Sequence, residues 1–191
     1  MNQKQPSSSS TTIDLRIQKT HKAIQTAFIE LLGQKEYEKI TVQEITETAL
    51  ISNNTFYKYY AGKSGLAGKM IAEFKTFYSE FLNKREQMSN PLQDLQTLHD
   101  KVFAKRELIL ALWKIKTPRH HLYADMQQMS KKTFITLAQQ HYGKSKDWDF
   151  QAEIFATMLF STWKYHLQRG LEHNVVQVWK DWEQILQLIR V

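Results

Sequence analysis

The sequence predicts an all-α fold, and three features of the chain indicate this class. Gly and Pro number only 6 and 3 in 191 residues, too few for the many turns of an all-β protein. Residues that favour helices, such as Leu, Ala, Gln, Glu and Lys, are abundant. Apolar residues recur at spacings of three and four, without strand-like alternation or an internal repeat.

The same spacing predicts about nine helices, divided between two domains. We expect residues 1–12, which are polar and rich in Ser and Thr, to form a disordered tail, with a DNA-touching arm as the alternative. Residues 13–78 are expected to form a first domain with helices at 15–32, 41–49, 52–60 and 64–87, the last of which runs on into the second domain. Residues 79–191 are expected to form a C-terminal helical bundle with helices at 92–116 (bent near 104–106), 119–142, 149–169 and 175–189.

The segment Thr41–Tyr60 has the pattern of two helices joined by a tight turn. Thr41 and Glu44 have the spacing of a capping box, which starts a helix, and Ser52 is a candidate N-cap for the second helix. A short second helix of this kind can enter the major groove of DNA, which is roughly 12 Å wide. The segment therefore predicts a helix-turn-helix.

Several side chains of the second helix have the chemistry that DNA contacts require. Asn53 and Asn54 open the helix, and asparagine can bond adenine with both ends of its amide. Hydroxyl groups suited to phosphate oxygens follow at Thr55, Tyr57 and Tyr59. We expect Phe56 and Tyr60 to point inward.

The charge around this helix also favours a polyanionic partner. The chain has a net charge of +7, which suits either nucleic acid or an anionic membrane surface. Between Glu47 and Glu73 lie 25 residues without a carboxylate, and they include Lys58, Lys63 and Lys69. Lys63 also starts a long helix, whose free amides suit a phosphate. The plain alternative is a solvated helical surface with ordinary caps.

Other classes of protein find little support in the sequence. The chain has no Cys, which excludes disulfides, thiolate metal sites and cysteine nucleophiles. The neighbouring His120 and His121 lack the spacing of a helical zinc site, and no Gly-rich phosphate loop or Ser-His-Asp arrangement is evident. We therefore expect no metal, no cofactor and no enzymatic activity.

The sequence also bears on the cellular compartment. No segment approaches the roughly 20 apolar residues that span a bilayer. The N-terminal residues lack the apolar core of a signal peptide. We expect a cytoplasmic protein that has no membrane partner.

From about Ile17 to Phe77 the chain resembles the tetracycline-repressor (TetR) family of bacterial regulators. The resemblance rests on residues 27–33 (AFIELLG), on residues 41–45 (TVQEI) and most specifically on residues 51–60 (ISNNTFYKYY), followed by Lys63, Ser64 and Leu66. Three departures stand out. Leu50 replaces the glycine usual in the turn, Tyr59-Tyr60 replaces a commoner His-Phe pair, and two glycines, at 65 and 68, weaken the start of the following helix.

The resemblance implies a sequence-specific transcriptional regulator, a repressor that binds a palindromic operator on double-stranded DNA as a dimer. It implies that Gln43, Asn53 and Asn54 face bases. It also implies that four side chains face phosphates: Thr41, Tyr57, Tyr59 and Lys63.

The C-terminal half is expected to bind an effector and to form the dimer. Its aromatic residues either form a core stripe or line a pocket for a small hydrophobic or aromatic effector, and the candidate wall residues are Trp113, Tyr123, Phe155 and Trp163. The dimer is expected through the last two helices, because the final one has a broad apolar stripe: Val175, Val178, Trp179, Trp182, Ile185 and Ile189. Control by a protein partner, with a filled core, is the alternative.

Overall fold

The computed structural model describes residues 8–84, 91–172 and 174–189, and within these ranges every regular element is helical. The all-α prediction is confirmed. The chain divides within one helix into two compact units, Met1–Ile71 (unit 1) and Ala72–Val191 (unit 2). The division lies seven residues before the boundary expected from sequence.

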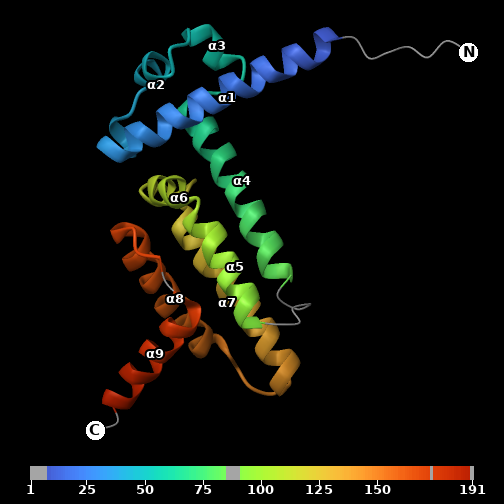
Figure 1. Cartoon of the computed structure of the whole chain (residues 1–191), viewed down its shortest axis with the longest axis vertical. Helices are drawn as coiled ribbons and strands as arrows, with labels where there is room; N and C mark the ends of the chain where they lie inside the picture. The colour runs from blue at the N-terminus through green and yellow to red at the C-terminus, as the bar shows by residue number, and fades with distance from the viewer. Residues whose placement is uncertain (1–7, 85–90, 173, 190–191) are drawn as a thin grey trace, which may run out of the picture. The chain divides into compact units, whose positions relative to one another are not determined.

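Unit 1 is built on one long helix, along which two short helices lie (Figure 1). Its elements are α1 (Ser8–Gln34), the 3-10 turn η1 (Tyr37–Lys39), α2 (Val42–Thr48), α3 (Asn53–Tyr57) and the first part of α4 (Lys63–Lys84). Its core is apolar and includes Ile24, Phe28, Leu32, Ile45, Phe56 and Leu66, which are fully buried. These residues recur at helical spacing, so each helix presents one apolar face to the others.

The first helix begins earlier than the sequence suggests. We expected a disordered tail through residue 12, but α1 starts at Ser8, so residues 8–12 of the expected tail are helical; residues 1–7 lie outside the described part. The prediction was wrong for 8–12 because Ser and Thr only mildly disfavour a helix that the apolar face farther along the chain stabilises.

Unit 2 contains the rest of α4 and five further helices, α5 (Pro91–Phe103), α6 (Arg106–Trp113), α7 (Leu122–Tyr142), α8 (Asp149–Arg169) and α9 (Val175–Ile189). α8 and α9 have the bounds expected from sequence. The bend expected near residues 104–106 is a break between two helices, α5 and α6. Gly170 ends α8 in the left-handed conformation, with φ of 65°, which glycine adopts without strain.

Polar contacts in unit 2 join α4 to α7 and α6 to α8. The Tyr78 hydroxyl lies 2.6 Å from Ser130 Oγ in the interior, and Lys75 pairs with Asp125 at 2.8 Å on the surface. The Arg106 guanidinium donates to the backbone oxygens of Leu167 and Gln168 in the last turn of α8. None of the helices that the structure describes has the length and apolar character needed to cross a membrane.

Candidate nucleic-acid interface

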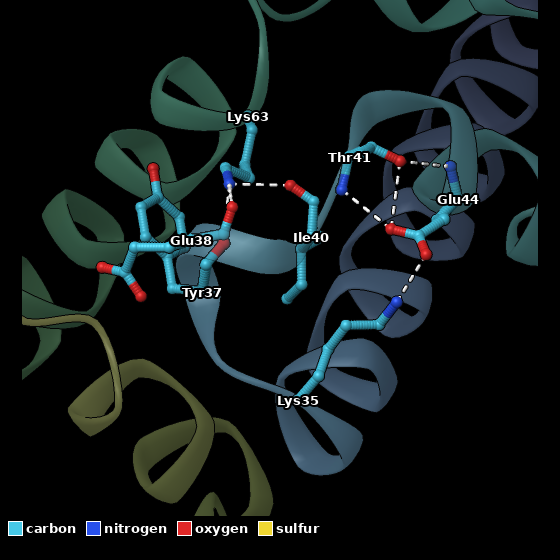
Figure 2. Close-up of polar contacts among 7 residues, drawn as sticks. All are labelled: Lys35, Tyr37, Glu38, Ile40, Thr41, Glu44 and Lys63. Carbon is cyan, nitrogen blue, oxygen red and sulfur yellow. Dashed lines mark hydrogen bonds and ion pairs between the residues drawn. The ribbon is translucent and has the colours of Figure 1, made fainter.

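The start of α2 is held by the predicted capping box, which is present in full. The Glu44 amide donates to Thr41 Oγ1 at 3.2 Å, and the Thr41 amide donates to Glu44 Oε2 at 2.9 Å. Lys35 from the end of α1 pairs with the other oxygen of Glu44 (Figure 2). The Lys35 hydrogen bond, followed by the bonds from Thr41, lowers the pKa of Glu44 from 4.5 to about 2. Thr41 is thus fixed in position while its side chain stays exposed.

The turn between α2 and α3 keeps its usual geometry although it lacks glycine. Leu50 has a φ of 54°, in the left-handed region, and its side chain is 91% exposed. The Leu50 amide donates to the Glu47 oxygen and the Ile51 amide donates to the Thr46 oxygen, the two bonds of a Schellman motif. The departure from the family pattern therefore leaves the turn intact and adds backbone strain, since a left-handed L-residue costs roughly 1–2 kcal/mol.

The exposed face of α3 consists of amide, phenol and ammonium groups. Ser52 caps the helix by accepting from the Thr55 amide, and the hydroxyls of these two residues lie 2.9 Å apart. Phe56 is fully buried, which turns Asn54, Tyr57 and Lys58 to the solvent; the Tyr57 side chain is 59% exposed. Gln43 on α2 is also exposed and bonds Glu47.

Asn53 differs from Asn54 because its amide is tied to the preceding helix. The Thr46 hydroxyl lies 2.7 Å from Asn53 Oδ1 and 2.9 Å from the backbone oxygen of Gln43, and Thr46 is buried. Reading adenine with both ends of an amide requires that both ends be free. Asn53 is exposed but has only one end free, so the bidentate reading predicted for it does not fit this geometry.

The end of α3 is fixed by an aromatic contact that the sequence did not reveal. His21 on α1 has its Nδ1 2.8 Å from the Tyr60 hydroxyl, and its ring lies 4.5 Å from that of Tyr59. Tyr60 is buried and Tyr59 is half-buried. The Tyr-Tyr pair, which departs from the family pattern, therefore joins the end of α3 to α1. A histidine 38 residues before Tyr59 gives no local signal of this contact.

Lys63 turns inward instead of toward a ligand. Its ammonium donates to the backbone oxygens of Tyr37, Glu38 and Ile40 at 2.6, 3.1 and 2.7 Å, as Figure 2 shows. The ammonium also lies 4.4 Å from the centre of the Tyr37 ring. Burial lowers the pKa of Lys63, whereas Glu38 and Glu44 act in the opposite direction. An ammonium has three hydrogens, and all three are used here. The predicted phosphate contact therefore does not fit, and Lys63 holds η1 to the start of α4.

In unit 2, two of the four aromatic residues predicted to line a pocket do so. Phe155 and Trp163 line a cavity of about 70 Å³, together with residues of α4, α5, α7 and α9. Trp113 and Tyr123 lie elsewhere, with their rings edge to face at 5.0 Å and both in contact with Phe160. These two residues belong to the core stripe, which was the alternative interpretation. Burial raises the pKa of Tyr123.

The apolar stripe predicted for the dimer is divided between two faces of α9. Val175, Val178 and Trp182 are half-buried and line the cavity, and the Trp182 indole donates to Thr162. Trp179 also lines the cavity but is 40% exposed, and Ile185 is 51% exposed; the side chain of Ile189 lies outside the described residues. The sequence pattern missed the exposed apolar residues Val176, Leu186 and Leu188.

A helix-turn-helix whose second helix exposes amide, phenol and ammonium groups defines a DNA-binding protein. Comparison with known sequences narrows this class, since residues 24–70 match the bacterial regulatory proteins of the tetR family. Residues 24–70 therefore form a DNA-binding domain of the TetR type. The chain is 42% identical over 60 residues to YxbF of Bacillus subtilis (strain 168), an uncharacterized HTH-type transcriptional regulator. The matched segment spans 31% of this chain and 16% of YxbF.

Solved structures resemble the chain over most of its length. A TerR/AcrR-family transcriptional regulator from Aquifex aeolicus VF5 has a TM-score of 0.61 at 17% identity, covering 89% of this chain and 99% of that one. A gamma-butyrolactone receptor (ArpA-like protein) has a TM-score of 0.58 at 17% identity, with coverage of 92% and 98%. The fatty acid degradation regulator FadR from Bacillus halodurans has a TM-score of 0.55 at 16% identity, with coverage of 86% and 96%. At these identities the likeness extends the shared fold to unit 2.

Proposed function

We propose that the protein is a cytoplasmic repressor that binds a palindromic operator as a homodimer and is released by a small effector. The observation that carries the DNA-binding part is the exposed face of α3. Asn54 has a free amide for a base edge, Tyr57 and Lys58 have a hydroxyl and an ammonium for phosphates, and Gln43 lies on the neighbouring helix. The other residues predicted to contact DNA hold this face in place through contacts within the protein: Thr41, Asn53, Thr55, Tyr59 and Lys63.

Base reading by Asn54 can be tested without a known operator. Selection from random duplex DNA would supply a preferred sequence, and fluorescence anisotropy would measure affinity for it and for single-base variants. Asn54→Ala should cost about 1–3 kcal/mol on the preferred sequence and flatten the preference at one base pair in each half-site. Asn83→Ala, at an exposed asparagine of α4, is the control and should change nothing. If Asn54→Ala left the sequence preference unchanged, Asn54 would not be a base-contacting residue.

The proposed dimer interface is the exposed apolar surface of α9 with the adjoining part of α8. From Glu183 to Leu188 every residue of α9 is exposed, and Ile185, Leu186 and Leu188 are 51%, 55% and 76% exposed. Apolar side chains gathered on one terminal helix favour burial against a second copy. A regulator that reads two half-sites also needs a two-fold dimer.

Charge placed on this surface should separate the two protomers. In sedimentation, the double variant Leu186→Glu and Leu188→Glu should give a monomer at concentrations where the wild type is a dimer. Gln187→Glu adds a charge at the exposed residue between them and should leave the dimer unchanged. A stable dimer in the double variant would place the interface elsewhere.

The proposed effector site is the cavity in unit 2. A cavity in unit 2 supports a small effector over control by a protein partner, for which a completely filled core would be expected. The gamma-butyrolactone receptor, which shares this fold, is named for a small molecule, and this supports the proposal. An effector can release DNA only to the extent that it binds the free and DNA-bound states with different affinities; a hundredfold loss of operator affinity corresponds to about 2.7 kcal/mol.

A further inference from the structure

The described residues that line the cavity in unit 2 carry no carboxylate, ammonium or guanidinium group, and this restricts its ligand. The cavity lies among five helices, and its fifteen described lining residues include no Asp, Glu, Lys or Arg. We propose that its ligand is a small, uncharged, mainly aliphatic molecule. This inference rests on the proposed effector role of the cavity and adds the chemical class of the effector.

Four of the polar groups in the wall are hydrogen bonded to one another in two pairs. The Tyr78 hydroxyl lies 2.6 Å from Ser130 Oγ, and the Trp182 indole donates to Thr162 Oγ1 at 3.1 Å. These pairs consume much of the hydrogen-bonding capacity of the wall. A ligand carboxylate or ammonium would lose its hydration and find no opposite charge among the described residues. An uncharged chain would lose little by entering.

His99 is the one titratable imidazole in the wall, and it does not supply a cation. It is only 3% exposed, and its ring lies 6.1 Å from that of Phe103. Burial lowers its pKa from 6.5, Asp100 acts in the opposite direction, and His166 lowers it further. The imidazole is therefore neutral near pH 7. A neutral imidazole can bond a hydroxyl or carbonyl group of a ligand but does not neutralise a carboxylate.

The cavity is small, which limits the size of its ligand. Its volume is about 70 Å³. An engineered protein cavity of about 150 Å³ binds benzene, so this one is about half of what an aromatic ring has been seen to occupy. A short aliphatic chain can change its conformation to fit an irregular space among side chains, which a rigid ring cannot do.

Three matched ligands separate charge from shape: pentan-1-ol, pentanoate and pentylammonium. Each is added near pH 7 to the full-length protein without DNA, and tryptophan fluorescence is recorded, because Trp163, Trp179 and Trp182 line the cavity. Pentan-1-ol should give a saturable change at a concentration at least tenfold lower than either ion. Equal binding of pentanoate or pentylammonium would overturn the uncharged class. If pentan-1-ol gave no saturable change in fluorescence, the proposal of an aliphatic ligand would be wrong.

Filling the cavity supplies the control for its location. Leu159→Phe adds volume at the wall and should abolish the pentan-1-ol response, whereas Leu110→Phe, at a half-buried residue of α6 outside the wall, should keep it. Val178→Leu, a smaller addition, serves if Leu159→Phe fails to fold. A response that persists in the filled variant would refute the site. Operator binding is measured separately, without ligand. If only the proposed ligand class is wrong, the protein still binds DNA. If only the proposed DNA binding is wrong, the cavity still binds pentan-1-ol.

Discussion

The inward position of Lys63 leads to a prediction opposite to the one the sequence suggests. Lys63→Met keeps a side chain of similar length over the Tyr37 ring and removes the ammonium. Two of the three carbonyl acceptors, those of Tyr37 and Ile40, are bonded in a partly buried site, and that of Glu38 is bonded at the surface. The variant therefore removes a bond from two partly buried carbonyls; that of Tyr37 keeps the bond from the Ile40 amide at 3.2 Å, and that of Ile40 has no ready replacement by water.

The expected loss of stability follows from these bonds. A hydrogen bond with a charged group contributes about 1.5–3 kcal/mol, and the cation–π contact adds about 0.5–1 kcal/mol. Partial burial of the Lys63 ammonium costs free energy, as the lowered pKa of Lys63 indicates, and this cost offsets part of the stabilisation. We expect the free energy of unfolding to fall by about 2–3 kcal/mol. Urea unfolding followed by circular dichroism measures this loss.

DNA binding distinguishes this role from a phosphate contact. Each neutralised phosphate contributes about 0.9 to the slope of log affinity against log salt. Lys63→Met should leave this slope unchanged at a temperature where the variant is folded. Lys58→Met, the same change at an exposed lysine of the α3 face, should reduce the slope by about 0.9 per protomer, or about 1.8 for the dimer on its operator, with little loss of stability. If Lys63→Met unfolds like the wild type and its slope falls, the ammonium binds phosphate and our assignment is wrong.

Three further predictions follow from contacts described above. Leu50→Gly should raise the free energy of unfolding by about 1 kcal/mol in urea, because glycine removes the left-handed strain and the exposed leucine loses almost no burial; a decrease would contradict the strain. The folded pKa of Glu44 lies below its ordinary value, so its stabilisation is complete above 4.5 and is lost as pH falls toward about 2. Glu44→Gln should therefore flatten stability over this window, and an unchanged pH profile would argue against the ion pair. Ser130→Ala should cost about 1–3 kcal/mol in thermal unfolding, since it leaves the buried Tyr78 hydroxyl without this partner, and a neutral result would show that the pair contributes nothing.

Local signals predicted much of the fold. The bounds of α8 and α9 follow from apolar spacing and from Gly170, whose left-handed conformation ends α8. The capping box of Thr41 and Glu44 lies within four residues, so the sequence alone indicates it. The buried position of Phe56 follows from the helical spacing of the apolar residues around it. In each case the residues that decide the structure are close together in the chain.

Contacts between distant residues could not be predicted in the same way. Lys63 bonds carbonyls 23 to 26 residues earlier, and neither spacing nor charge distinguishes it from a lysine that faces solvent. The same is true of His21, which reaches Tyr60 across 39 residues. The aromatic residues of unit 2 follow one helical pattern, which does not separate core from cavity. Trp113 and Trp163 therefore look alike in the sequence although only Trp163 lines the cavity.

The bond between Thr46 and Asn53 has a consequence for how α3 meets a base. The hydroxyl has one hydrogen but faces two acceptors, the Gln43 backbone oxygen and the Asn53 amide. If the hydrogen goes to the amide oxygen, Asn53 turns its NH₂ outward as a donor. If it goes to the backbone, the amide rotates by half a turn, gives its NH₂ to Thr46, and turns its oxygen outward as an acceptor. The outward end of the Asn53 amide can thus be either a donor or an acceptor, so the side chain by itself does not fix which kind of group it would bond.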